Sequence, residues 1–326
     1  MGKISKNLKI IKHEVFLIRR LLEEGYGPRY WWSYLKNRFF GNYLFKYLPW
    51  HDYIPNLDLE IHTICCKSDI WMLAWMMKSF LATSGLKPML VIHEDGTIDE
   101  ATAKLILSKF PNTKIMFRSE IKRKILEMSD VPESVKKAVR ECHLFFDRLV
   151  NIFIFSRAKN IIISDSDILY YKEPKEVVDF VNGKSNYDAL VSASHYALSP
   201  PTDGKGSFDL MMDSYYMERY NLKGNAIQYL NGGYIVISRS ELGMYKLEEF
   251  LAHTVRPVSN YFIEMSCFAC ILAQLKYTFL SVDAYHFKGP VTERTIFKHF
   301  TSPRRYEMFA YGIDKARRAM EKVKLG

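Results

Sequence analysis

The chain has 326 residues, of which 48% are hydrophobic and 25% are charged, as is ordinary for a folded globular protein. Its net charge of +10 suits an anionic partner, such as a phosphate-bearing nucleotide, a membrane surface or a nucleic acid. The sequence has no clustered basic stripe and no zinc-finger or RNA-motif spacing. We therefore expect no nucleic acid among its partners.

The five cysteines are odd in number and thinly spread, which indicates reduced thiols in a reducing compartment. Cys267 and Cys270 form a CxxC pair, but the surrounding segment 263–275 reads as a buried helix, in which residues three apart share a face. We therefore expect packed core thiols in preference to a redox pair or a zinc site. The first residues lack a secretory signal, and no apolar run reaches about 18 residues. These features predict a cytoplasmic protein that does not span a membrane.

Residues 1–55 predict a basic, aromatic helical extension. Leu8, Ile11, Val15, Ile18 and Leu22 recur at helical spacing with Lys and Arg between them, and a Trp- and Phe-rich stretch follows. Such a segment suits peripheral contact with the inner face of a membrane. The alternative, which we favour, is an extension packed on the body of the protein.

From residue 56 to residue 326 the pattern predicts one α/β domain. Short apolar strands alternate with amphipathic helices, which implies a mainly parallel central sheet flanked by helices on both faces. The expected strands are 59–66, 88–93, 114–118, 160–164 and 234–237, and the expected helices include 68–85 and 99–110. Residues 119–159 read as charged and helical, and residues 196–210 as a long loop or lid.

Two carboxylates directly follow the buried strand 160–164. Asp165 and Asp167 stand one residue apart, at the carboxyl edge of the sheet, where open α/β sheets bind ligands. If the chain stays extended there, alternation directs both side chains to one side. Hard oxygen ligands in that place could bind Mg²⁺ or Mn²⁺ and leave positions for phosphate oxygens. The alternative is a simple turn at the strand end, because Asp and Ser favour turns.

The segment 161–174 resembles the DxD motif of GT-A-fold glycosyltransferases, in which the motif is followed by an apolar pair, an aromatic residue and a proline. Further likenesses, in the same order along the chain, extend this resemblance over residues 59–312. It implies a GT-A-like fold and transfer of a sugar from a nucleotide-sugar donor, a UDP-sugar, to a saccharide or lipid-linked acceptor. It also implies that Asp165, Ser166 and Asp167 hold the donor together with Mn²⁺ or Mg²⁺.

Other residues match the family at shorter motifs. Asn231, Gly232 and Gly233 resemble its element near the donor sugar, where glycines let the backbone approach a ligand; a tight turn before a strand is the alternative. His299 resembles the histidine that completes the metal site. Arg304 and Arg305 come shortly after His299, in a position from which they could neutralise a diphosphate leaving group. The alternative is a solvated basic turn.

The remaining candidates are single residues. Glu264 begins an apolar helix and could be a general base, or simply a charge that stabilises the start of the helix. The resemblance places Lys67 and Asp69 near the nucleotide base and ribose, and makes Asp147 and Arg148 candidates for donor contact. Two other functions stay open: a phosphatase with an aspartate nucleophile, and a non-catalytic protein that binds a nucleotide-sugar or a membrane.

Overall fold

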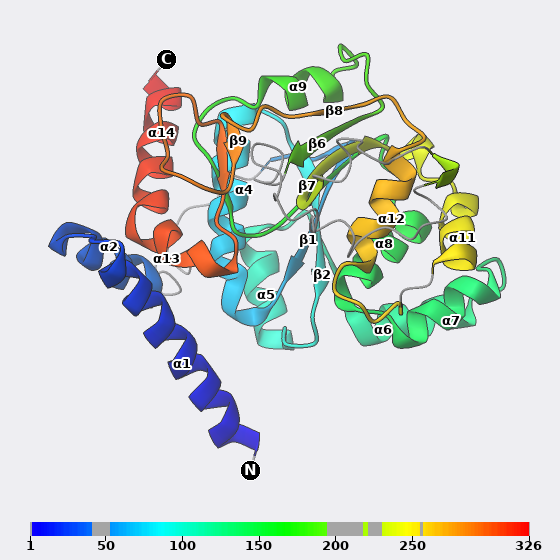
Figure 1. The fold of residues 1–326 in the computed structure, drawn as a ribbon, viewed down its shortest axis with the longest axis horizontal. Helices are drawn as coiled ribbons and strands as arrows, with labels where there is room; N and C mark the ends of the chain where they lie inside the picture. Colours follow the sequence, from blue (N-terminus) through cyan, green and yellow to red (C-terminus); the bar gives the residue numbers. More distant parts are fainter. Residues whose placement is uncertain (1, 41–52, 194–217, 221–229, 255–256, 326) are drawn as a thin grey trace.

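The computed structural model of the protein describes residues 2–40, 53–193, 218–220, 230–254 and 257–325 (Figure 1). The strands in this part of the chain are β1 (Asn56–Cys65), β2 (Pro88–Glu94), β3 (Thr113–Met116), β4 (Asn160–Ser164), β5 (Ile168–Tyr170), β6 (Ala189–Ala193), β7 (Leu230–Ser238), β8 (Tyr277–Phe279), β9 (Tyr285–His286) and β10 (Phe297–His299). The longer helices are α1 (Gly2–Glu23), α2 (Pro28–Phe39), α4 (Ile70–Ser84), α5 (Glu100–Lys109), α6 (Arg118–Glu127), α7 (Glu133–Glu141), α8 (Leu144–Phe155), α9 (Lys175–Val181), α11 (Met244–His253), α12 (Ile263–Leu272) and α14 (Ile313–Leu325).

In the described part of the chain, seven strands form the central sheet, in the order β3-β2-β1-β4-β7-β6-β8. Four of the six pairs among these described strands are parallel, and the two pairs made by β7 are antiparallel. The expected mainly parallel sheet flanked by helices is confirmed. A second, small sheet of order β5-β10-β9 begins where β4 ends.

The two faces of the central sheet are covered by two separate hydrophobic cores. Alternation along β4 shows the division: Ile162 belongs to the core built with α4 and α5, whereas Ile161 and Ile163 belong to the core built with α8 and α12. The helices lie accordingly on opposite sides of the sheet in Figure 1. Cys267 and Cys270 are buried in the second core, where the sequence placed them.

Several element boundaries differ from the sequence-based expectation. The helical stretch 119–159 is divided into α6, α7 and α8, because α6 ends before Pro132 and a second break at Cys142 precedes α8. Gly85 ends α4 in the left-handed conformation, at φ +67°. The expected loop 196–210 lies outside the described residues.

The N-terminal helices pack on the C-terminal end of the chain. Leu17, Leu21 and Tyr34 are buried in the core that also contains Phe309. The side-chain amide of Asn37 donates a hydrogen bond of 2.8 Å to the carbonyl oxygen of Phe309. Among the helices that the structure describes, none combines the length and the apolar character that a membrane span requires.

Candidate functional site

The site begins at the turn that links the two sheets. Ser164 is the last residue of β4 and Ile168 the first of β5, so Asp165 and Asp167 lie in a three-residue turn. The amide of Asp165 donates to the carbonyl of Gly233 over 2.9 Å, and Asp167 accepts at its carbonyl from the amide of Phe300 over 2.8 Å. The assumption of a continuing extended chain was therefore wrong. The turn, and not strand alternation, orients the two carboxylates.

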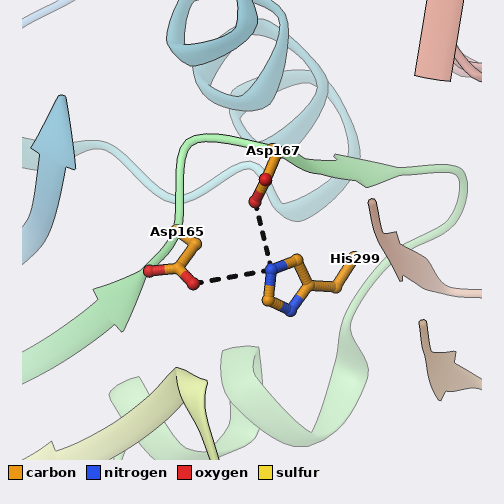
Figure 2. A group of neighbouring side chains, drawn as sticks. All are labelled: Asp165, Asp167 and His299. Atoms are coloured by element: carbon orange, nitrogen blue, oxygen red, sulfur yellow. Dashed lines mark ion pairs between the residues drawn. The ribbon is translucent and has the colours of Figure 1, made fainter. Parts of the chain in front are cut away.

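His299 reaches the two aspartates because of strand pairing. β10 runs antiparallel to β5, and its last residue, His299, lies opposite Ile168, next to Asp167 in the chain. The imidazole Nε2 lies 3.1 Å from Oδ1 of Asp167 and 3.5 Å from Oδ2 of Asp165, as the dashed lines in Figure 2 show. One nitrogen therefore faces both carboxylates.

Two arginines hold the opposite oxygens of the same carboxylates. Arg148, on α8, donates from Nη1 to Oδ1 of Asp165 over 3.3 Å. Arg305 donates from Nε to Oδ2 of Asp167 over 3.0 Å. Each carboxylate thus has one oxygen fixed by a guanidinium and the other directed at His299, which leaves one oxygen of each to converge with the imidazole on a common point.

The protonation of the three side chains follows from this arrangement. Burial raises the pKa of Asp165 above its ordinary value, although the charges of Arg148 and His299 act in the opposite sense. Burial also acts to raise the pKa of Asp167, but the charges of Arg305 and His299 outweigh it and lower that pKa to about 2. Burial alone would lower the pKa of His299, yet the facing carboxylates raise it. The site therefore attracts positive charge at its centre.

The same geometry fits a divalent cation. The ligand atoms of Asp165, Asp167 and His299 all lie within 4.8 Å of one another, as donors that share an ion must. Two carboxylate oxygens with one imidazole nitrogen form a donor set that suits Mn²⁺. The second ring nitrogen of His299, Nδ1, is buried and makes no hydrogen bond to the described residues.

Gly233 is the residue that gives the imidazole room. A Cβ atom built on Gly233 would lie 2.8 Å from Oδ2 of Asp165 and 2.8 Å from Nδ1 of His299, closer than side chains tolerate. Asn231, Gly232 and Gly233 lie inside β7 and not in a turn before it, which corrects that alternative. Glycine is needed at position 233, because a side chain there would collide with Asp165 and His299.

We therefore expect Gly233→Ala to disturb the cluster without unfolding the protein. The added methyl would push His299 or Asp165 aside, and Mn²⁺ affinity measured by calorimetry should fall about 10- to 100-fold. Gly232→Ala is the matched control, because its Cβ would be equally crowded, at 2.6 Å from Cγ of Met265, but would meet no member of the Asp165, Asp167 and His299 cluster. Equal Mn²⁺ affinity in both variants would contradict the role assigned to Gly233.

A cavity of about 360 Å³ opens above the three side chains. Among the described residues, its wall contains His299, two arginines, Arg148 and Arg305, and five acidic residues, Asp69, Asp95, Asp165, Asp167 and Glu264. In a protein of net charge +10, the described wall of this cavity has an excess of acidic groups. An anionic ligand would be repelled there unless a cation came with it.

Most of the residues singled out in the sequence line this cavity. They are Asp69, Arg148, Asp165, Ser166, Asp167, Asn231, Gly232, Gly233, Glu264 and His299. Asp69 is turned toward the site by Arg305, whose Nη1 donates to Oδ2 of Asp69 over 3.1 Å.

Three of the predicted donor contacts lie elsewhere. Lys67 is exposed and pairs with Asp99. Asp147 is buried against Arg118, whose Nε lies 2.6 Å from its Oδ2. Arg304 pairs with Glu307 and lines a different cavity, while Arg305 takes the place expected for it. Successive helical residues point about 100° apart, which explains why Asp147 and Arg304 face away while their neighbours Arg148 and Arg305 line the cavity.

Glu264 has a geometry unlike that of a general base. It lies in the first turn of α12 and is 3% exposed, and its two oxygens accept from Nε and Nη2 of Arg148, both over 2.8 Å. Burial raises the pKa of Glu264, although Arg148 acts to lower it. With both oxygens occupied, the carboxylate is arranged to hold Arg148 in place.

Sequence reasoning missed Asp95 and Tyr261, which also line the cavity. Asp95 directly follows β2, so the rule applied to Asp165, that ligands bind at the carboxyl ends of strands, would have found it. Tyr261 lies in an irregular segment before α12 and has no comparable signal.

No protein-family model and no curated protein sequence matches the chain. Solved structures do resemble it. The apo structure of the bifunctional glycosyltransferase WbbM aligns with a TM-score of 0.52 at 13% identity, over 84% of this chain and 53% of that one. The galactosyltransferase LgtC with donor and acceptor sugar analogues aligns with a TM-score of 0.49 at 11% identity, over 81% of this chain and 95% of the LgtC chain. Mouse xyloside xylosyltransferase 1 aligns with a TM-score of 0.47 at 9% identity, over 76% of this chain and 98% of the other chain.

The likeness to WbbM establishes the class of fold: this is a mixed α/β fold of the GT-A-like kind found in glycosyltransferases. The chain spans about half the length of the WbbM chain. At 13% identity, the comparison does not extend to substrates.

Proposed function

We propose that the protein is a metal-dependent glycosyltransferase that moves a sugar from a nucleoside diphosphate sugar, a UDP-sugar, to an acceptor hydroxyl. The observation that carries the proposal is the convergence of Asp165, Asp167 and His299 on one point at the floor of an acidic cavity. The GT-A-like fold supports it, because the solved structure of WbbM that it resembles is a glycosyltransferase.

In this proposal Asp165, Asp167 and His299 hold Mn²⁺ or Mg²⁺. When bound, the cation supplies positive charge to the diphosphate as the bond to the sugar breaks. Arg305 contributes a second positive charge beside Asp167, on the cavity wall. Arg148 is held by Glu264 and fixes one oxygen of Asp165, so the ligand stays in one orientation.

The other walls suit the remaining parts of the substrates. Asp69 could accept a hydrogen bond from a ribose hydroxyl, and the side-chain oxygen of Asn231 already accepts from the amide of Gly233 over 2.9 Å, which orders the strand beside the donor sugar. The rings of Phe145 and Tyr261 line the cavity in an edge-to-face contact, 4.9 Å between centroids. An amphipathic aromatic surface of this kind suits a saccharide or lipid-linked acceptor.

Metal removal tests the proposal most directly. We expect calorimetry to show UDP binding in the presence of Mn²⁺ and at least about 100-fold weaker binding after chelation, since the acidic cavity repels an uncompensated diphosphate. A panel of UDP-sugars would then identify the sugar. Equal UDP affinity with and without Mn²⁺ would overturn the proposed role of the cation.

Donor hydrolysis separates an enzyme from a binding protein of the same fold. A transferase should release free sugar slowly from its own donor, and Asp167→Asn should abolish that release. A phosphatase would instead cleave p-nitrophenyl phosphate. Phosphatase activity requires an oxygen of Asp165 that is free to attack phosphorus. It is disfavoured, because Oδ1 of Asp165 accepts a hydrogen bond from Arg148 and Oδ2 faces His299.

A further inference from the structure

The N-terminal helices present an apolar surface that nothing in the described part of the chain covers. Ten of the seventeen exposed large hydrophobic residues in that part lie between positions 15 and 40. They are Val15, Phe16, Ile18, Leu22, Tyr30, Trp31, Trp32, Leu35, Phe39 and Phe40. Folded proteins rarely concentrate exposed aromatic residues in this way without a binding purpose.

From Trp32 onward, the exposed apolar side chains of α2 lie on one face, whereas Tyr30 contacts the ring of Tyr311. In α2, Trp32, Leu35 and Phe39 follow the i, i+3, i+7 spacing and are 69%, 42% and 56% exposed, whereas Tyr34 and Asn37 on the other face are buried. Because the inner face is anchored on the body, the outward direction of the aromatic face is fixed.

The longer helix α1 is arranged in the same way. Val15 and Leu22 are 58% and 48% exposed, while Leu17 and Leu21 are buried in the core. In Figure 1 the N-terminal end of α1 projects clear of the α/β domain, where an extended surface could reach it.

This apolar surface is set in a strongly basic segment. Residues 1–40 contain nine Lys or Arg against three Glu, so they carry six of the ten net positive charges of the chain. Lys12 and Arg19 are exposed on α1, between the outward apolar residues. A second copy of this segment would bring like charges together, whereas an anionic surface would neutralise them.

We propose that α1 and α2 form a docking surface for the anionic headgroups and outer acyl region of a lipid bilayer. The helices would lie in the plane of the interface, with Trp32 and Phe39 inserted and Lys12 and Arg19 contacting phosphates. This inference concerns a surface separate from the cavity of Asp165 and Asp167, and it holds whatever reaction takes place there.

The test is co-sedimentation of the full chain with vesicles of phosphatidylcholine alone or mixed in equal parts with phosphatidylglycerol. We expect binding to the mixed vesicles only, weakened when the salt is raised from about 0.1 M to about 1 M. Lys12→Gln with Arg19→Gln should weaken binding on the order of 30-fold. Trp32→Ser with Phe39→Ser should weaken it at least as much. Circular dichroism should report an unchanged fold, because the substituted side chains are exposed.

Matched controls come from exposed residues elsewhere. Arg123→Gln with Lys137→Gln repeats the loss of charge, and Leu107→Ser with Tyr245→Ser repeats the loss of apolar surface. Both should bind like the unchanged chain. Equal binding to neutral and anionic vesicles would overturn the proposal. So would control variants that weaken binding as much as the substitutions on α1 and α2. A different result would also overturn it: no binding to vesicles, together with a dimer in light scattering that the Trp32→Ser, Phe39→Ser variant no longer forms. This face would then contact a second copy of the chain.

Discussion

Asp167→Asn should lower the rate of sugar transfer by at least about a thousand-fold, while the protein stays folded. The amide keeps the shape of the side chain but removes the negative charge that faces His299 and Arg305. A metal held in this place would contribute several kcal/mol to stabilising the departing diphosphate, which corresponds to about three powers of ten in rate. Transfer measured with the donor identified by the UDP-sugar panel gives the readout, and Mn²⁺ affinity by calorimetry should fall with it.

Asp95→Asn is the matched control for this experiment. Asp95 lines the same cavity, but its Oδ1 accepts from the amide of Thr97 over 3.0 Å, and it is not part of the His299 cluster. The chemical change is identical, so an equal loss in both variants would indicate a general effect of cavity charge. Full activity in Asp167→Asn would contradict the assignment of this residue as a ligand.

The architecture could be predicted from the sequence because its strongest signals are local. The run of three isoleucines in β4 is buried on both faces of the mainly parallel sheet, and the polar turn that follows it marks the carboxyl edge of the parallel strands. Alternation of apolar strands with amphipathic helices is likewise readable from periodicity alone. For these reasons the mainly parallel sheet and the place of Asp165 and Asp167 could both be predicted from the sequence.

The sequence could not predict the direction of individual side chains. Asp147 and Arg148 are neighbours on α8, yet only Arg148 faces the cavity, and the same division separates Arg304 from Arg305. A sequence places such a pair near a site but does not indicate which member faces it. That outcome depends on how the helix is rotated against its neighbours, which is a property of tertiary packing.

The pairing of β10 with β5, which are far apart in the sequence, could not be predicted from local signals either. His299 is more than 130 residues from Asp165, and the register of β10 on β5 brings them together. Only the family resemblance pointed to it. The requirement for glycine at position 233 also depends on this pairing, since the clash of a Cβ would be with His299 itself.

Arg148→Met should lower the free energy of unfolding by about 3–5 kcal/mol, the usual cost of removing one partner from a buried ion pair. Arg148 is 1% exposed and holds both oxygens of Glu264, which is itself buried, together with one oxygen of Asp165. Methionine fills a similar volume but leaves the carboxylate of Glu264 without a cation. Urea denaturation followed by circular dichroism measures the loss.

The double variant Arg148→Met, Glu264→Gln separates a buried unpaired charge from a simple loss of packing. If the unpaired carboxylate causes most of the destabilisation, neutralising it should restore much of the lost free energy, so the two substitutions would be strongly non-additive. Arg123→Met, on the exposed face of α6, should change stability by less than about 0.5 kcal/mol. Additive effects of the two buried substitutions would mean that Glu264 and Arg148 are stabilised independently, and Glu264 would then not serve to hold Arg148 against Asp165.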